Sequence, residues 1–495
     1  MYLIGLDIGS SSIKASIINA ETGICLKSVF HPKQELEMIA VQQGWAEQDP
    51  EIWWTNVKNT VKDILNDTQV NKEDIKAIGI SYQMHGLVVV DKDNKLLRPS
   101  IIWCDSRAVE IGNKAFKDMG EAFCQSRLLN SPGNFTASKL KWIQENEPET
   151  YKKIHKIMLP GDYIAMKLTG KAATTIPGLS EGIFWDYEAQ EISKELLEYY
   201  KIDKDIIPEI VPTFGVQGQL TSAAARELGL SDKTLVTYRA GDQPNNAFSL
   251  NVLNPGEIAA TAGTSGVIYG VSAGVASDKL NRVNTFAHVN YTKEDPRCGV
   301  LLCINGTGIL YSWLRKNFFS KHSYDELNTM AGHAAIGSHG LTVIPFGNGA
   351  ERVLGNLNPG AAFLNLDFNK HTGGDIIRAA QEGIVFSFNY GLQVMRELGI
   401  EPSTIKAGQA NMFQSDIFSS AFSTLTGVEV ELYETDGSVG AARAAGLGAG
   451  IYKNSVEVFK EFKPLHIIEP TVREKGQYED AYGIWKTKME KYITN

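Results

Sequence analysis

The start of the chain places an acidic residue directly before a turn of small and hydroxyl-bearing residues. Asp7 ends an apolar run, residues 2–7, and after Gly9 come Ser10, Ser11 and Ser12. Small residues let backbone N–H groups approach an anion, and serine hydroxyls add donors. The neighbouring carboxylate could hold Mg²⁺ through water molecules. The pattern fits a phosphate site, but taken alone it fits a plain hairpin turn with a capping aspartate at least as well.

A second turn of the same chemical kind follows about half a chain later. Gly263, Thr264 and Ser265 lie between two predicted strands, residues 257–261 and 267–271. Either turn alone is also compatible with a plain hairpin. Two such turns in matching positions predict that each half of the chain offers one donor loop to the phosphates of a nucleotide.

A third candidate is the carboxylate of Asp242. It follows a predicted strand, residues 234–239, and ligands of open α/β sheets collect at the carboxyl ends of strands. Asp242 could therefore accept a proton from a hydroxyl that attacks a phosphoryl group. The competing interpretation is an N-cap for the helix predicted at residues 245–251 after Pro244, because aspartate is a good cap.

Three further segments carry polar groups at predicted strand ends. Residues 83–86 (Gln-Met-His-Gly) offer uncharged donors and acceptors that suit a polyol, although a lone histidine is more often structural. In residues 103–107, Trp103 could flank a sugar, and Asp105 and Arg107 could form an ordinary surface ion pair. Residues 406–411 form a glycine-containing turn that either admits a flat adenine ring or is only a loop.

Familiar phosphate-binding signatures are absent from the sequence. It contains no G-x-x-x-x-G-K-[ST] motif and no G-x-G-x-x-G motif that opens a helix after a strand. By motif, the protein is therefore neither a P-loop enzyme nor a protein kinase.

The elements that must position these residues belong to a chain of two halves. Strand–turn–strand units open both halves, a helix is predicted at residues 50–67, and a break falls near residues 251–256. We therefore predict an α/β protein with domains at residues 1–251 and 252–495. The length of 495 residues permits two or three domains, and the motif order favours two.

Composition restricts the partners and the compartment. The net charge of −9 argues against nucleic-acid or polybasic membrane binding. The five scattered cysteines fit a reducing compartment, and no apolar stretch approaches the roughly 18 residues of a membrane-spanning helix. We expect a cytoplasmic protein with a small-molecule substrate and neither nucleic acid nor membrane as a partner, and a homodimer is one compatible assembly.

Taken in order, the motifs resemble the FGGY family of carbohydrate kinases over nearly the whole chain. The resemblance rests on residues 7–12, 44–50, 83–86, 103–107, 241–243 and 263–266 and on the turn at Gly408. It implies two actin-like, ribonuclease-H-like ATPase domains around a central cleft. It also implies ATP and Mg²⁺ as cofactors and phosphorylation of D-xylulose to D-xylulose 5-phosphate.

The resemblance further implies a role for each matching residue. Asp242 corresponds to the catalytic base, and Asp7 to the aspartate that orients the waters of Mg²⁺. The implied sugar-binding residues are Met84, His85, Trp103, Asp105, Asp242 and Gln243. The implied nucleotide-binding residues are Ser11, Ser12, Gly263, Thr264, Gly306, Thr307, Gly408, Gln409 and Asn411.

Departures from the family pattern leave alternatives open. Gln243 follows the base where many relatives have asparagine, and the adenosine turn has one glycine, Gly408, where the family often has two or three. Another sugar, ribulose or gluconate, is therefore an alternative substrate. Glycerol is disfavoured because its kinases carry an Arg-Glu pair at the positions of Met84 and His85. A non-kinase actin-like ATPase is the remaining alternative.

Overall fold

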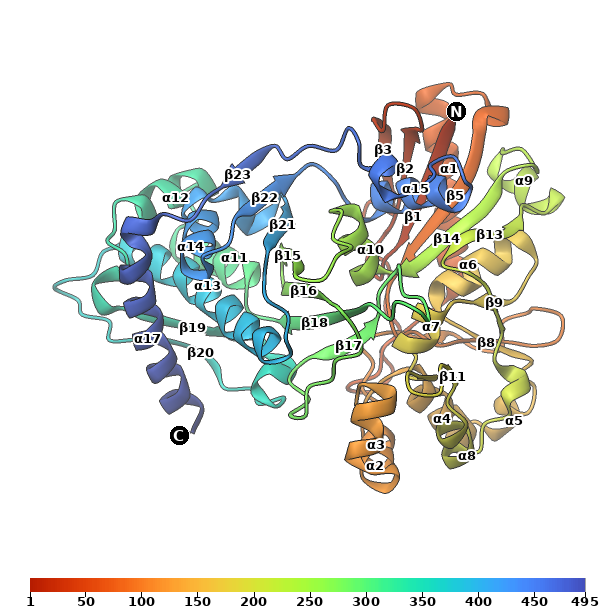
Figure 1. The fold of residues 1–495 in the computed structure, drawn as a ribbon, viewed down its shortest axis with the longest axis horizontal. Helices are drawn as coiled ribbons and strands as arrows, with labels where there is room; N and C mark the ends of the chain where they lie inside the picture. The colour runs from red at the N-terminus through yellow and green to blue at the C-terminus, as the bar shows by residue number, and fades with distance from the viewer. Residues whose placement is uncertain (495) are drawn as a thin grey trace. The chain divides into compact units, whose positions relative to one another are not determined.

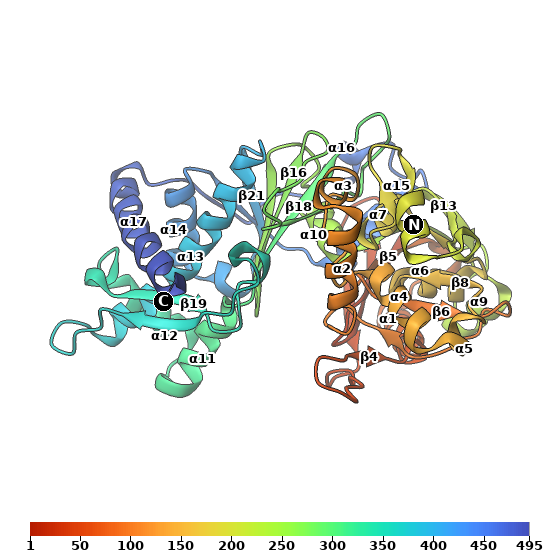
Figure 2. The same cartoon turned by 90° about the horizontal axis from the view of Figure 1, so that it is seen from below.

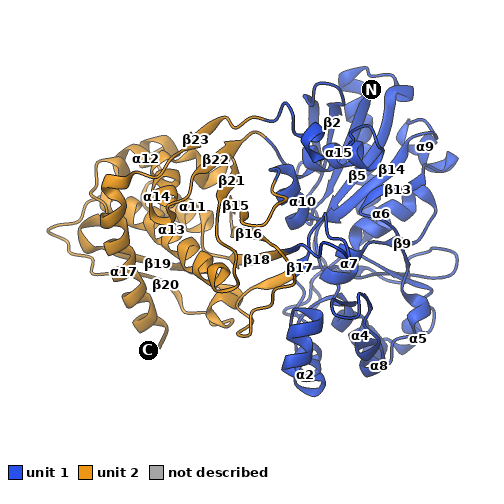
Figure 3. Cartoon of the chain, in the orientation of Figure 1, with its two compact units in different colours: residues 1–251, 286–298, 435–462 blue, residues 252–285, 299–434, 463–495 orange. Residues whose placement is uncertain are grey.

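The computed structural model describes residues 1–494, which form two compact units (Figure 3). Unit 1 comprises residues 1–251, 286–298 and 435–462, and unit 2 comprises residues 252–285, 299–434 and the chain from residue 463 onward. The sequence analysis predicted two continuous ranges that divide after residue 251. In the structure the chain passes between the units at that point and then returns to unit 1 twice.

Unit 1 is an α/β unit, and its elements are drawn in Figure 1. Its strands are β1 (Tyr2–Ile8), β2 (Ile13–Asn19), β3 (Cys25–His31), β4 (Glu47–Gln48), β5 (Ile75–Tyr82), β6 (Val88–Val90), β7 (Ser100–Ile101), β8 (Lys156–Met158), β9 (Ala173–Thr174), β10 (Trp185–Asp186), β11 (Glu191–Ile192), β12 (Glu209–Ile210), β13 (Phe214–Gln219) and β14 (Leu235–Gly241). Its helices are α1 (Pro50–Thr68), α2 (Val109–Met119), α3 (Glu121–Phe123), α4 (Thr136–Asn146), α5 (Pro148–Tyr151), α6 (Pro160–Thr169), α7 (Ile176–Glu181), α8 (Lys194–Tyr200), α9 (Ser222–Leu228), α10 (Asp242–Ser249), α15 (Gly437–Gly448) and α16 (Ser455–Val458).

The main sheet of unit 1 has the strand order β13-β14-β5-β1-β2-β3. Strand β1 pairs antiparallel with β2 and parallel with β5, and β5 pairs parallel with β14. Alternate residues of β1 face opposite sides: Ile4 and Leu6 pack in the core with α1 and α6, whereas Leu3 packs with α15. Parallel strands covered by helices on both faces are the α/β arrangement expected from the sequence.

Helix α15 lies directly on the sheet because two glycines leave room for its backbone (Figure 1). Gly5 of β1 is in register with Gly79 of β5. A Cβ atom at Gly5 would lie 1.8 Å from the carbonyl oxygen of Ser438, and one at Gly79 would lie 2.0 Å from that of Ala441. This close approach explains why a segment so late in the chain belongs to unit 1.

Unit 2 has its own mixed sheet. Its strands are β15 (Glu257–Ala262), β16 (Gly266–Ser272), β17 (Asn284–Ala287), β18 (Cys298–Ile304), β19 (Thr342–Phe346), β20 (Gly360–Leu364), β21 (Thr404–Gly408), β22 (Val430–Tyr433) and β23 (His466–Ile468), and its helices are α11 (Gly308–Phe318), α12 (Tyr324–Gly332), α13 (Gly373–Glu397), α14 (Asp416–Thr426) and α17 (Val472–Thr494). The main sheet has the order β17-β18-β16-β15-β21-β22-β23.

The two main sheets repeat one pattern. In unit 2, β15 pairs antiparallel with β16 and parallel with β21, and β21 pairs parallel with β22. These relations match those of β1 with β2, β5 and β14 in unit 1. An apolar core of unit 2 is built around α13, which packs against α14 and α17 (Figure 2). Among residues 1–494, no helix combines the length and apolar character needed to cross a membrane.

Candidate functional site

Two carboxylates of unit 1 stand at the ends of β1 and β14, the two parallel strands that flank β5. Asp7 is near the end of β1 and in register with Ser81 of β5, and Asp242 directly follows β14. Asp242 is the first residue of α10, and Pro244 fits within the first turn because it needs no hydrogen-bond partner there. The interpretation of Asp242 as the cap of a helix at residues 245–251 is therefore wrong, since Gly241 occupies the cap position.

The charge of Asp7 affects the ionisation of Asp242. Burial, followed by the negative charge of Asp7, raises the pKa of Asp242 to about 7. Burial also raises the pKa of Asp7; a hydrogen bond from Ser81 and the charge of Lys14 oppose this rise, and Asp436 adds to it. A carboxylate with a pKa near the working pH is matched to accepting a proton from an alcohol.

The N-terminal end of α15 completes the surroundings of Asp7, which sequence analysis did not foresee. Asp436 caps the helix by accepting hydrogen bonds from the backbone N–H groups of Ser438 and Val439, at 2.9 and 3.1 Å, and it pairs with Lys14 of β2. A Cβ atom at Gly437 would lie 2.6 Å from the carboxylate of Asp7. The signal available in the sequence was an aspartate before a Gly-Ser pair that opens a small-residue helix.

Two side chains from other segments of unit 1 hold the turn at residues 9–12 between β1 and β2. Gln48 donates to the carbonyl of Ser10 at 2.7 Å, and the indole N–H of Trp103 donates to its hydroxyl at 3.3 Å. Ser11 is exposed and Ser12 is partly buried. The turn thus presents its hydroxyl groups at the end of the β1–β2 hairpin, on the strand that carries Asp7.

Met84 and His85 follow β5 and lie beside the end of β14. Met84 is only 5% exposed, and a Cβ atom at Gly241 would lie 2.5 Å from its Cγ. His85 has a backbone φ of 62°, and its Nδ1 is 3.0 Å from the carbonyl oxygen of Glu181. Partly buried Gln243 is next to Asp242 and helps to stabilise its ionised form. The structure therefore brings Met84, His85, Asp242 and Gln243 together.

Trp103 and Asp105 differ sharply in their exposure. The side chain of Trp103 is half exposed, and that of Asp105 is fully buried. The carboxylate of Asp105 accepts from the backbone N–H of Ala46 at 2.6 Å and from the guanidinium of Arg107 at 2.7 to 3.0 Å. Arg107 also pairs with Glu47 at 2.6 Å. In this arrangement Asp105 supports the loop that carries Trp103, and the expected surface ion pair is in fact buried.

Two buried ionisable residues beside this cluster were missed by the sequence analysis. Glu181 of α7 is 2% exposed, its Oε1 has no hydrogen-bond partner among the described residues, and burial followed by the charge of Asp242 raises its pKa. Lys139 of α4 has no exposed surface. Neither residue stands in a motif, since only the packing of α4 and α7 brings them to the site.

Unit 2 gathers several of the predicted nucleotide-binding residues at one hairpin. Gly263 and exposed Thr264 form the turn between β15 and β16. The hydroxyl of Thr307 donates to the carbonyls of Gly263 and Thr264, at 3.0 and 3.2 Å, and is fully buried. A Cβ atom at Gly263 would lie 3.5 Å from the amide nitrogen of Asn411. Thr307 therefore holds the backbone of the turn through its hydroxyl group, and Asn411 lies next to Gly263.

The remaining predicted nucleotide-binding residues, Gly306, Gly408 and Gln409, make backbone contacts near this hairpin. A Cβ atom at Gly306 would lie 1.6 Å from the carbonyl oxygen of Pro345, so only glycine fits there. Gly408 ends β21, and exposed Gln409 donates its backbone N–H to the carbonyl of Tyr433 at 2.9 Å. These contacts fix the chain, and they leave the side chain of Gln409 at the surface.

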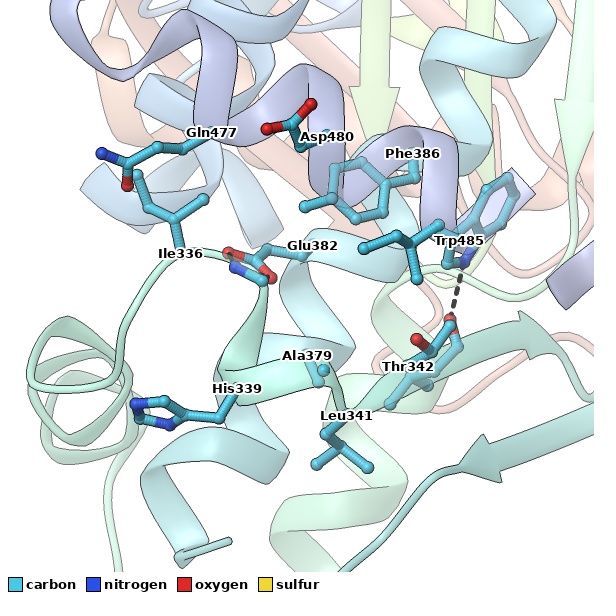
Figure 4. A pocket seen from close by; sticks show the side chains of 15 residues that line it. Ile336, His339, Leu341, Thr342, Ala379, Glu382, Phe386, Gln477, Asp480 and Trp485 are labelled. Atoms are coloured by element: carbon cyan, nitrogen blue, oxygen red, sulfur yellow. Dashed lines mark hydrogen bonds between the residues drawn. The ribbon is translucent and has the colours of Figure 1, made fainter. Parts of the chain in front are cut away.

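A cavity of about 310 Å³ in unit 2 lies apart from all of these residues. Its wall consists of α13, α17 and residues 336–343 (Figure 4). The carboxylate of Glu382 is held by Arg378 at 2.8 Å and by the backbone N–H of Gly337 at 3.1 Å. None of the predicted site residues lines this cavity. Within residues 1–494, no group of three or more His, Cys, Asp or Glu side chains is arranged to hold a metal ion.

Comparison with known proteins places this geometry in a family. The family description "FGGY family of carbohydrate kinases, N-terminal domain" matches residues 2–249. The solved xylulose kinase from Lactobacillus acidophilus, determined with a ligand bound, has a TM-score of 0.90 and 22% identity, covering 99% of this chain and 98% of that one. The gluconate kinase from the same organism has a TM-score of 0.89 and 21% identity, with the same coverage. The fold is thus that of the actin-like ATPases.

Sequence comparison agrees over the full length. The xylulose kinase of Staphylococcus epidermidis is 29% identical over 503 aligned positions, which cover 99% of this chain and 97% of that protein. Since the family description covers half of the residues, the chain belongs to the FGGY family of carbohydrate kinases. Membership implies that the enzyme binds a sugar and uses ATP.

Proposed function

We propose that this enzyme transfers the γ-phosphoryl group of ATP to the terminal hydroxyl of D-xylulose, giving D-xylulose 5-phosphate and ADP. The observation that carries the proposal is the partly buried carboxylate of Asp242, whose pKa is raised to about 7, beside Met84 and His85. A neutral sugar needs directional hydrogen bonds and apolar contact, and this corner of unit 1 offers both. The full-length similarity to a protein named xylulose kinase supports the choice of sugar.

Asp242 is the proposed general base. It accepts the proton of the hydroxyl as the oxygen forms a bond to the γ-phosphorus, and the bond from that phosphorus to the bridging oxygen of ADP breaks. Phosphoryl transfer depends chiefly on positioning and on stabilising the spreading charge. For the phosphates we assign the turns with Ser11 and Ser12 in unit 1 and with Gly263 and Thr264 in unit 2.

The nucleotide is assigned to unit 2 and the metal ion to unit 1. Gly306, Thr307, Gly408, Gln409 and Asn411 form or support the hairpin proposed to hold the nucleotide. Asp7 fits Mg²⁺ because its partly buried carboxylate offers hard oxygen donors, and a magnesium ion keeps several of its waters. When bound, the ion would neutralise charge on the phosphates.

The cysteines also bear on where the enzyme works. All five cysteines lack a disulfide bond. Free thiols are usual in reducing compartments, which supports a cytoplasmic location as part of the proposal.

A gluconate kinase is the second candidate, because the solved gluconate kinase has nearly the same structural similarity. The two functions differ in the charge of the substrate. A carboxylate such as gluconate's is attracted by a cation, whereas Met84 and His85 offer an apolar group and an imidazole that also contacts a carbonyl. A pair that contains no lysine or arginine favours the ketose.

A panel of sugars tests the assignment. ADP release is measured with D-xylulose, D-ribulose, D-gluconate and glycerol at equal concentration, with Asp242→Asn as the control for contaminating kinases. We expect kcat/KM for D-xylulose to exceed that for each other compound by at least tenfold. A preference for gluconate or ribulose would overturn the substrate, and ADP release that no sugar stimulates would overturn the sugar-kinase mechanism.

A further inference from the structure

Lys139 is a buried cation whose role no sequence motif indicated. It lies in α4 and its side chain is completely inaccessible to solvent. Its ammonium nitrogen donates to the carbonyl oxygens of His85, at 2.9 Å, and of Ile102, at 3.0 Å. The ammonium group therefore joins two segments that are far from α4 in the sequence.

These two carbonyls belong to the two segments that carry the proposed sugar contacts. His85 is itself one of those residues, and Ile102 directly precedes Trp103. The backbones of Leu87 and Ile101 also pair, at 2.9 and 3.2 Å, so the segments are already neighbours. Lys139 links the two segments again at His85 and Ile102, just beyond the paired residues Leu87 and Ile101 and close to the side chains of His85 and Trp103.

His85 requires such support because of its backbone conformation. Its φ of 62° lies in the left-handed region, which costs a residue with a Cβ atom free energy unless its surroundings hold it. The imidazole packs edge-on against Phe135, with ring centroids 4.7 Å apart, and its Nδ1 contacts the carbonyl oxygen of Glu181. The bond from Lys139 fixes the other side, at the carbonyl of the strained residue.

Apolar packing does not explain a lysine at this position. Burial lowers the pKa of Lys139 to about 7, and the charges of Asp105 and of Cys104 partly oppose that effect, whereas Arg107 adds to it. Asp105 is already bound to Arg107 at 2.7 Å, so the ammonium has no carboxylate of its own. A methionine would fill similar volume without the desolvation penalty of a buried charge. The two carbonyl bonds are what the lysine adds.

We infer that Lys139 is a positioning residue that sets the affinity for the sugar by fixing His85 and Trp103 relative to each other. The inference rests on the proposed function, because it assigns the sugar to these two residues. Lys139 donates to neither phosphate turn, and its link to the first one is indirect, through the long 3.3 Å bond from Trp103 to the hydroxyl of Ser10. Its loss should therefore weaken sugar binding and leave nucleotide binding and the transfer step nearly unchanged.

The test compares Lys139→Met with Lys141→Met. Lys141 is on the same helix but partly exposed, where it contacts Gln144 at 2.6 Å, so it controls for removing a lysine from α4. Steady-state kinetics with D-xylulose and ATP should show the sugar KM of Lys139→Met raised at least tenfold, with the ATP KM and kcat within threefold of wild type. Lys141→Met should match wild type. An unchanged sugar KM in a folded Lys139→Met protein, or a fall in kcat alone, would overturn the inference.

A second measurement applies even where Lys139→Met does not fold. Sugar binding to Asp242→Asn is measured by calorimetry from pH 6 to pH 9, because this variant lacks the proposed base. A neutral amine is a weaker donor, so affinity should fall about three- to tenfold as pH rises through 7. A pH-independent affinity overturns the inference. If wild type phosphorylates another sugar instead, the substrate assignment fails, and the same comparison with that sugar tests Lys139.

Discussion

Replacing the proposed base should make the enzyme inactive and more stable at the same time. Asp242→Asn keeps the shape of the side chain but removes its charge and its ability to accept a proton. In the native protein the pKa of this group is about 7 instead of 3.8. Because the folded pKa is raised, folding favours the protonated form, and the ionised form opposes folding at higher pH.

The size of this effect follows from the difference in pKa. Each tenfold change in an ionisation constant corresponds to about 1.4 kcal/mol, so a rise from 3.8 to about 7 corresponds to about 4 kcal/mol above pH 7. The penalty grows as pH rises from 3.8 to 7 and is constant above that range. We expect Asp242→Asn to recover part of it, about 2–4 kcal/mol at pH 8, and almost none near pH 4.

Urea unfolding of both proteins at pH 5, 6, 7 and 8 measures the difference. Asp436→Asn is a matched control because it makes the same substitution at an aspartate whose pKa is lowered in the folded protein, whereas the pKa of Asp242 is raised. Burial alone would raise the pKa of Asp436, but its pairing with Lys14 and its hydrogen bonds from Ser438 and Val439 together lower that pKa. Its charge therefore stabilises the protein above the unfolded pKa, and that contribution is lost as pH falls. Asp436→Asn should be less stable than wild type at pH 8.

Activity is the other half of this prediction. Without a base, kcat should fall by about 10²–10⁴. In wild type, kcat/KM should decline about tenfold per pH unit below 7 as Asp242 becomes protonated. The reasoning would be refuted by near-normal turnover of Asp242→Asn. A stability gain that is the same at pH 5 and pH 8 would refute the electrostatic part.

Three further predictions concern the parts that hold the site. Gly79→Ala should cost about 3 kcal/mol or prevent folding because its Cβ atom would meet the backbone of α15, whereas Gly476→Ala, with no atom within 4 Å, should raise the melting temperature slightly. Arg107→Met should cost about 3–5 kcal/mol in urea unfolding, since it leaves a buried carboxylate unpaired, and unchanged stability would contradict this. Thr307→Val should raise the KM for ATP severalfold through loss of two hydrogen bonds and leave the sugar KM unchanged.

Local chemistry made the main elements of the fold predictable. The strand expected at residues 2–7 is Tyr2–Ile8, and the helix expected at 50–67 is Pro50–Thr68, capped by Asp49. A short apolar run, a proline and a capping aspartate act within a few positions of one another, so the sequence shows them directly. The two hairpin turns were visible for the same reason.

The long-range parts of the candidate site could not be found in this way. The ion pair of Lys14 with Asp436 joins positions 422 residues apart, and the burial of Lys139 depends on how α4 packs. Asp105 was expected to contact the sugar, and the structure shows its oxygens occupied by Arg107 and Ala46. Residue type and spacing do not show whether an aspartate such as Asp105 is bound by other residues of the protein or is left to bind a ligand.

The return of residues 435–462 to unit 1 has a consequence for how the protein is made. Ribosomes release the N-terminal part first, and its sheet then lacks α15, the helix that covers Leu3, Ile18 and Ala77. The surroundings of Asp7 are complete only when Asp436 and Gly437 have been synthesised. We therefore expect that translation halted before α15 yields chains that chaperones retain and that cannot consume ATP. The complete surroundings of Asp7 therefore form only after residues 435–462 have been synthesised.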